Sequence, residues 1–109
     1  MAIERTLEKE ELELLSCLLK AIGKNIFDLD KTKVIPLDDG GIGSLYIVHE
    51  KKEKDSRRFG AVLYEKEFLD TDRVPILIAL NVDQDGDLFE LDIWKVDFSP
   101  VKLYPRCDD

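Results

Sequence analysis

The residues from Ile76 to Pro100 read ILIALNVDQDGDLFELDIWKVDFSP, and this stretch decides the fold. Two apolar runs flank the pair Asp85-Gly86, which is the strongest short-range signal for a β-hairpin. Both central residues of a type I′ turn need positive φ, which glycine tolerates and aspartate adopts at modest cost. The sequence therefore predicts two antiparallel strands joined by a tight type I′ turn.

The apolar positions of the second run change parity along the strand. Phe89, Leu91 and Ile93 share one face, whereas Trp94 and Phe98 take the other. Because side chains alternate between the faces of a strand, either both faces are covered there or a β-bulge near Trp94 shifts the phase. An exposed tryptophan would be a strong anchor for a protein partner, but in so apolar a strand we expect Trp94 in the core.

An amphipathic helix precedes the strands. Apolar residues recur at helical spacing from Leu12 to Ile22, which predicts a helix over about residues 7–22 with one apolar face. Thr6 is the expected N-cap, and Gly23 is the expected left-handed residue that ends the helix. We expect the apolar face to pack on a sheet.

Three further strands are expected between the helix and the hairpin. They fall at Val34–Leu37, Leu45–His49 and Phe59–Phe68, the last with a bend at Gly60. Polar turns separate them, and no helical pattern lies between them, which favours antiparallel pairing. The predicted fold class is α+β: an N-terminal amphipathic helix packed on a mainly antiparallel sheet of about five strands, over about residues 33–98.

The composition fits a single α+β domain over residues 1–109, with a short C-terminal tail. Apolar residues make up 44% of the chain and charged residues 37%, a balance typical of a globular fold. Sixteen basic and 24 acidic side chains give a net charge of −8. This charge argues against nucleic-acid binding and would steer a cationic protein toward the chain.

The expected location is the cytoplasm. The N-terminal MAIERTLEKEELELL is charged throughout and lacks the pattern of a secretory signal. No apolar run reaches the length of a membrane span, so we expect no membrane contact. Cys17 in the helix and Cys107 in the tail fit a reducing compartment.

Motifs for catalysis, cofactors or metals are weak. Asp83, Asp85 and Asp87 lack the spacing of an EF-hand loop, so we expect a solvated hairpin tip. The glycine-rich run Gly40–Ser44 leads into a strand and lacks the lysine of a phosphate-binding loop. A pocket near Gly40–Ser44 with His49, the single histidine of the chain, stays open as a small-ligand or catalytic site.

We therefore expect no catalytic residue, no cofactor and no metal ligand. The candidates for contact with a partner are instead exposed acids near turns, extended along the polar face of the last strand. They are Asp38, Asp39, Asp83, Asp85, Asp87, Glu90 and Asp92.

Four segments, EELELLSCLLKAIG, PLDDGGIGSL, RRFG and LNVDQDGDLFELDIWKVDFSP, together resemble a family of small bacterial domains without assigned biochemical activity. They are spread over most of the chain, and the resemblance implies an α+β fold without supplying a catalytic residue. In size, charge and type the chain is also similar to immunity proteins of bacterial toxin systems, including contact-dependent growth inhibition. Such proteins neutralise a cognate toxin domain by binding it.

The leading hypothesis is a non-enzymatic, protein-binding immunity protein whose partner is a cationic toxin domain such as a nuclease. One alternative is a small-ligand-binding protein or enzyme with a site near Gly40–Ser44 and His49. The other is a structural or regulatory domain. The sequence leaves the oligomeric state open.

Overall fold

The computed structural model describes residues 3–24, 29–37 and 43–105. In these residues it contains one α-helix, α1 (Lys9–Ala21), and two short 3-10 helices, η1 (Leu29–Lys31) and η2 (Lys54–Ser56). The strands are β1 (Arg5–Thr6), β2 (Lys33–Pro36), β3 (Leu45–Ile47), β4 (Phe59–Leu69), β5 (Pro75–Asp83) and β6 (Leu88–Lys95). The α+β class and the N-terminal helix are confirmed, and the strand count is six instead of five.

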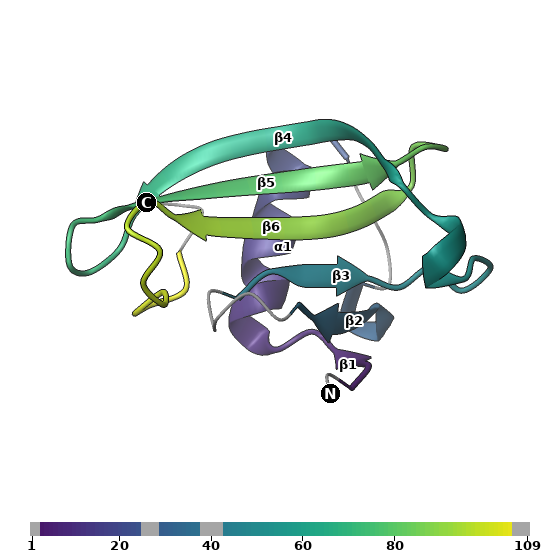
Figure 1. Ribbon diagram of the computed structural model, residues 1–109, viewed down its shortest axis with the longest axis horizontal. Coiled ribbons are helices and arrows are strands. Elements are labelled where there is room, and N and C mark those ends of the chain that lie inside the picture. The colour runs from purple at the N-terminus through teal and green to yellow at the C-terminus, as the bar shows by residue number, and fades with distance from the viewer. Residues whose placement is uncertain (1–2, 25–28, 38–42, 106–109) are drawn as a thin grey trace.

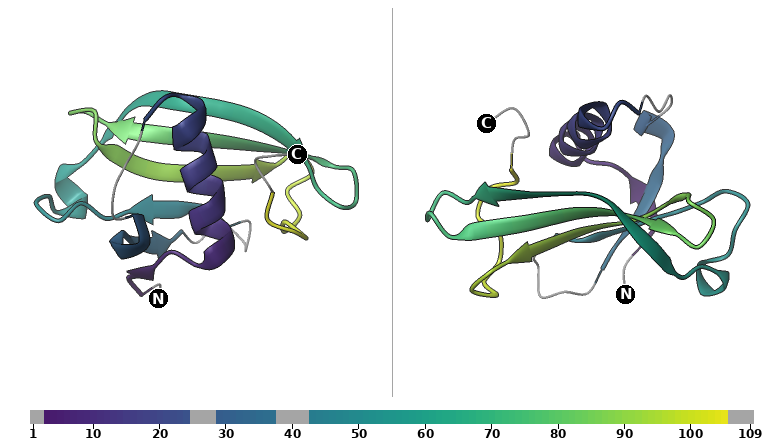
Figure 2. Two further views of the ribbon diagram at one scale, coloured as in Figure 1. Left: turned by 180° about the vertical axis from the view of Figure 1, so that it is seen from behind. Right: turned by 90° about the horizontal axis from the view of Figure 1, so that it is seen from above.

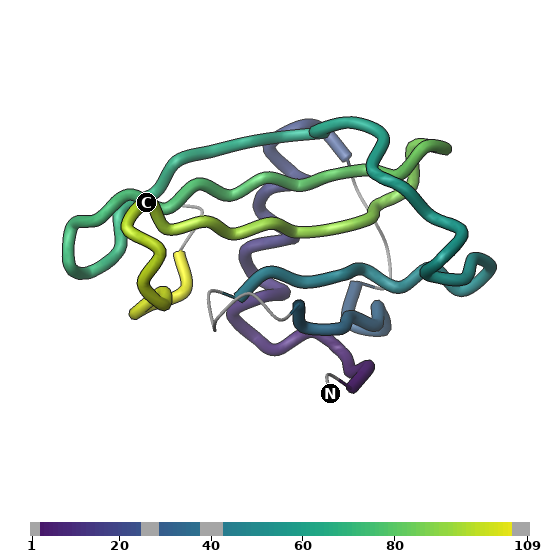
Figure 3. Tube along the Cα trace, in the orientation of Figure 1, coloured from purple at the N-terminus to yellow at the C-terminus, as the bar shows by residue number. Residues whose placement is uncertain are grey.

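The six strands form one sheet in the order β1-β2-β3-β6-β5-β4 (Figure 1). Every neighbouring pair is antiparallel. The last strand, β6, inserts between β3 and β5 and so joins the short strands to the long β4-β5-β6 meander, whose path is clearest in the Cα trace (Figure 3). The pairing of β6 with β3 makes the C-terminal hairpin the centre of the sheet.

Helix α1 crosses one face of the sheet and leaves the other face without a helix in the described structure (Figure 2). Four leucines of α1 and the inward side chains of the central strands are at most 4% exposed and form one core. They are Leu14, Leu15, Leu18 and Leu19 of α1, Leu45 and Ile47 of β3, Ile76, Ile78 and Leu80 of β5, and Leu91 and Ile93 of β6. Each such side chain contributes about 1.5–3 kcal/mol by leaving water.

The helix begins later than the sequence pattern suggests. Thr6, the expected N-cap, instead pairs with Lys33 in the two-residue strand β1, so that expectation is wrong. Glu8 occupies the cap position, and its backbone N–H donates to Glu11 Oε1 at 2.8 Å. Arg5 Nη1 and Nη2 donate to Glu11 Oε1 at 2.7 Å and Oε2 at 2.9 Å, and these two hydrogen bonds connect β1 to the first turn of α1.

The end of α1 follows the expectation. Gly23 has φ +73°, and its N–H donates to the carbonyl of Lys20 at 3.1 Å. The N–H of Lys24 reaches back to Leu19 at 2.9 Å. These bonds satisfy carbonyls that the end of a helix leaves without partners, and the left-handed conformation costs glycine little. Among the described residues, no helix has the length and apolar character needed to cross a membrane.

The β5–β6 hairpin is confirmed, but its turn is not type I′. Asp83 and Asp87 close the loop, with the N–H of Asp83 donating to the Asp87 carbonyl at 2.8 Å. Gly86 has φ +87°, whereas Asp85 does not have positive φ. The loop therefore spans three residues and ends in a left-handed glycine, the second most common way to close a hairpin.

Strand β6 keeps its alternation through Trp94. The register between β5 and β6 is regular up to Asn81 and shifts only beyond it, so of the two alternatives the bulge near Trp94 is absent. Trp94 is 47% exposed on the face turned away from α1, so its expected core position is wrong. Lys95 takes the buried place instead, opposite Ile76, and finds acidic partners there.

Gly60 lets the start of β4 lie against the β5–β6 hairpin. The register of β4 with β5 shifts between Phe59 and Ala61. A Cβ at Gly60 would stand 2.1 Å from the carbonyl oxygen of Asp83, a distance that no real side chain occupies. The close approach of two backbones therefore requires glycine.

We predict that Gly60→Ala lowers the free energy of unfolding by about 2–3 kcal/mol, because the extra methyl must push β4 away from Asp83. Gly23→Ala is the matched control: its Cβ meets open space, and the left-handed backbone alone costs about 1 kcal/mol. Urea titration of the three proteins measures the difference. Equal destabilisation of the two variants would mean that β4 does not approach the hairpin this closely.

Candidate functional site

The tip of the β5–β6 hairpin is solvated, as expected, and it also carries an ion cluster. The ammonium of Lys52 lies 3.0 Å from Asp83, 2.9 Å from Asp85 and 2.7 Å from Asp87, measured from Nζ to a carboxylate oxygen in each case. Arg57 Nε donates to the same oxygen of Asp83 at 2.9 Å. The ammonium of Lys52 thus lies among three carboxylates. We call these five residues the hairpin cluster.

The carboxylate of Asp83 organises this cluster. Its second oxygen accepts the backbone N–H groups of Asp85 at 2.9 Å and Asp87 at 3.1 Å, so it also shapes the turn. Burial alone would raise the pKa of Asp83, but the donors from Lys52, Arg57 and the backbone hold it well below its ordinary value of 3.8. Asp83 is therefore charged at neutral pH although it is 2% exposed.

Arg57 links the two halves of the sheet. Its side chain is fully buried and donates to the carbonyls of Ile47 at 2.7 Å and of Leu88. The guanidinium lies 5.5 Å from the ring centre of Tyr46 and 5.1 Å from that of Phe89, within the range of cation–π attraction. Arg57 therefore has a structural role, and its position in a highly charged stretch of the sequence does not predict its burial.

The hairpin cluster determines which of the predicted contact acids are accessible and carry a net negative charge. Asp83 is buried, so its carboxylate is not available at the surface. Asp85 and Asp87 remain accessible, but Lys52 compensates much of their charge. Asp38 and Asp39 lie outside the described residues.

A second ion cluster, the tail cluster, fixes the segment that follows β6. Lys95 Nζ lies 2.9 Å from Asp70 and 2.6 Å from Asp72, in the turn between β4 and β5. Asp70 also accepts the backbone N–H groups of Lys102 at 2.7 Å and Leu103 at 3.1 Å. Burial would raise the pKa of Asp70, but these donors lower it to about 2. The cluster therefore fixes the segment after β6 to the turn between β4 and β5.

Ser44 and His49 do not form a nucleophile and base. Ser44 is 6% exposed; its Oγ accepts the N–H of Ile93 at 2.8 Å and donates to its carbonyl at 3.1 Å. His49 lies beyond the opposite end of β3, where Nδ1 accepts the N–H of Lys51 at 3.0 Å and Nε2 lies 3.5 Å from Asp87. The hydroxyl therefore serves to attach β3 to β6.

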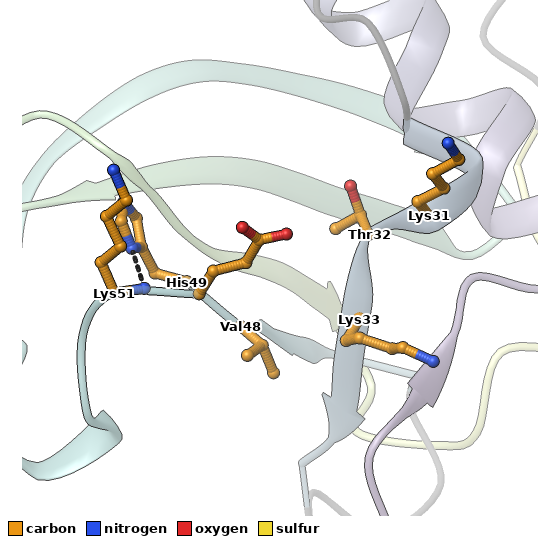
Figure 4. A pocket seen from close by; sticks show the side chains of 7 residues that line it. Lys31, Thr32, Lys33, Val48, His49 and Lys51 are labelled. Atoms are coloured by element: carbon orange, nitrogen blue, oxygen red, sulfur yellow. Dashed lines mark hydrogen bonds between the residues drawn. The ribbon is translucent and has the colours of Figure 1, made fainter.

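An open hollow of about 490 Å³ lies beside His49 (Figure 4). It is lined by Lys31, Thr32, Lys33, Val48, His49, Glu50 and Lys51. Lys51 lies on one side of the hollow with His49, whereas Lys31 and Lys33 lie on the other side and point away from each other. Ser44 does not line this hollow, and Gly40 to Ile42 lie outside the described residues. The polar groups do not converge on one point, which a specific small-ligand site requires.

The face of β4, β5 and β6 turned away from α1, which we call the open face, carries charge of one sign. The two basic residues of these strands, Lys66 and Lys95, pair with Ile78 and Ile76 and so lie on the helix face. The cross-strand register places four acids on the other face, two on β4 and two on β6. They are Glu65, Glu67, Glu90 and Asp92.

An aromatic pair stands at one end of the open face. Trp94 packs at a ring-centre distance of 5.9 Å from Phe98, which is 71% exposed. Phe98 has φ +63°, a left-handed conformation that is uncommon for a bulky residue. Its N–H donates to the carbonyl of Lys95 at 2.9 Å, so the turn after β6 holds it beside Trp94. Figure 1 looks onto this face, with α1 behind it.

The sequence pattern contains part of this surface. Glu90 and Asp92 were predicted contact residues, and both lie on the open face. Glu65, Glu67 and Trp94 were missed, although strict alternation through Ile93-Trp94-Lys95 would have placed the indole outward. Within the described residues, no group of three or more His, Cys, Asp and Glu side chains is placed to hold a metal ion.

Fold and surface together describe an acidic α+β protein with one helix-covered sheet face, one open face and, in the described residues, no converging set of catalytic groups. The chain belongs to a family described as a domain of unknown function (DUF6984), which matches residues 4–105. No curated protein matches the chain, and no solved structure matches it.

We predict that Asp70→Asn lowers the free energy of unfolding by about 3 kcal/mol at pH 7, because it leaves Lys95 buried with one carboxylate less. The folded-state pKa of about 2 is below the ordinary 3.8, so this stabilisation is complete above pH 3.8 and disappears as the pH falls through 2. The difference in free energy of unfolding between wild type and Asp70→Asn should therefore decrease as the pH falls from 3.8 to 2.

Urea titrations at pH 7, 4 and 2 measure this gap. Asp97→Asn is the control, because Asp97 is exposed and its carboxylate accepts bonds from the neighbouring Ser99. A gap that stays constant with pH would contradict a charged, buried Asp70.

Proposed function

We propose that the protein is a non-enzymatic binding module that docks a cationic protein domain on the open face. In this proposal it acts as an immunity protein and neutralises a cognate bacterial toxin domain by covering its functional surface. The cytoplasm is the proposed location, because a toxin that acts on cytoplasmic nucleic acid must be met there. Cys17 is disulfide-bonded in the structure, so the expectation of a reducing compartment from its thiol is wrong and does not support this location.

The exposed Trp94–Phe98 pair beside the acids of the open face carries this proposal. Tryptophan is enriched among the few residues that dominate binding energy, because it buries a large surface at low cost in side-chain entropy. An exposed pair of this kind stabilises the free protein little, so its benefit is expected in a complex.

The charge distribution supports a cationic partner. In the hairpin cluster, Lys52 and Arg57 oppose three aspartates. On the open face, Glu65, Glu67 and Glu90 have no basic neighbour from β4, β5 or β6 on that face. A field of one sign accelerates encounter with an opposite surface and rejects anionic competitors.

The test uses the protein encoded beside this gene, purified and titrated into the protein by calorimetry at low and high salt. We expect binding that Trp94→Ala weakens by about 30-fold or more, as for a hot spot of 2 kcal/mol. The double change Glu65→Gln with Glu67→Gln should mainly slow association and flatten the salt dependence.

Ile3→Ala is the matched control, because Ile3 is 78% exposed and lies outside the open face. Asp85→Asn is a second control for the hairpin cluster and should change affinity by less than about threefold. Absence of binding, or equal losses in Trp94→Ala and Ile3→Ala, would contradict docking on the open face. If the partner is an enzyme, its activity should fall with wild type and persist with Trp94→Ala.

A further inference from the structure

One buried acceptor on the open face lacks a donor. Asn81 on β5 is 3% exposed, and its Nδ2 donates to Asp92 at 2.7 Å. Its Oδ1 is shielded from solvent and accepts no hydrogen bond from the described residues. A buried acceptor left in this state costs free energy, so a donor that reaches it recovers that free energy.

Glu90 lies directly opposite Asn81 on β6. It is half-buried, and its carboxylate makes no hydrogen bond or ion pair with any residue that the structure describes. Burial and the charge of Asp92 raise the pKa of Glu90, whereas the charge of Lys54 lowers it. The carboxylate thus lies in a negative, partly dry environment that favours a cation.

We propose that Asn81 and Glu90, with Asp92 beside them, receive one guanidinium group of the partner protein. This inference rests on the proposed function and names the side chain that the open face recognises.

A guanidinium fits this pair better than an ammonium. Directly opposite residues on neighbouring antiparallel strands have Cβ atoms about 5 Å apart. The planar fork of arginine presents five donors in a fixed plane and can reach two such acceptors at once. A lysine ammonium is a compact point charge that is more costly to dehydrate, so it gains less here.

The same geometry sets the spacing of the partner's contacts. Trp94 follows Glu90 by four residues on the same face, which is roughly 13 Å at the rise of a strand. We infer that the partner presents an arginine and an apolar contact surface at about this separation.

The experiment titrates the whole, isotope-labelled protein with ethylguanidinium chloride and, separately, with ethylammonium chloride at constant ionic strength. NMR follows the side-chain amide of Asn81 and the indole N–H of Trp94. We expect a saturable shift at Asn81 with ethylguanidinium, and binding about fivefold weaker or worse with ethylammonium.

Glu90→Gln should weaken ethylguanidinium binding by about tenfold, the loss of one charge-assisted hydrogen bond. Glu13→Gln, an exposed acid of α1 outside the open face, is the matched control and should leave the titration unchanged. Linear, unsaturable shifts, or equal binding to wild type and Glu90→Gln, would overturn the proposal. A calcium chloride titration that saturates the Asn81 signal more tightly than ethylguanidinium would also overturn it and assign a metal ion.

The two experiments distinguish failure of the guanidinium site from failure of the proposed docking on the open face. If the partner binds through Trp94 but Glu90→Gln leaves its affinity unchanged, docking stands and the guanidinium site is wrong. If ethylguanidinium binds as expected but no cationic protein does, the site stands and the docking proposal is wrong.

Discussion

The buried ion pair between Arg57 and Asp83 is the interaction on which the rest of the sheet depends. Arg57 reaches the carbonyls of Ile47 on β3 and Leu88 on β6, while Asp83 ends β5 and shapes the turn into β6. One salt bridge therefore sets how three strands meet. Removing either partner would leave a desolvated charge, which costs more than the pair itself contributes.

This pair also decides where the negative charge of the chain can act. By drawing Lys52 toward Asp83, Asp85 and Asp87, the hairpin cluster compensates the acids that look most exposed in the sequence. The tail cluster draws Lys95 inward in the same way. The acids of the open face have no basic residue of β4, β5 or β6 beside them on that face, so their negative field points away from α1.

Local patterns were sufficient for the elements and insufficient for the site. Leucine periodicity and the left-handed Gly23 predicted α1, and the hairpin followed from apolar runs around Asp85-Gly86. The turn type was missed because one extra loop residue changes which positions need positive φ. The burial of Arg57 has no local signal, because its partners lie on β3, β5 and β6, and no sequence spacing encodes such contacts.

Trp94 is exposed and Lys95 is buried, the reverse of what hydrophobicity alone predicts, and this connects the fold with the proposed binding of a partner. Hydrophobicity alone would bury the indole and expose the ammonium, yet alternation along β6 fixes one residue on each face. Burying Lys95 is tolerable because Asp70 and Asp72 meet its charge, and this places Trp94 on the open face. An ion cluster on the helix side thus holds an aromatic anchor on the other. A chain that needed stability alone would gain by the reverse arrangement, because a packed apolar residue in place of a buried ion pair is often neutral or stabilising.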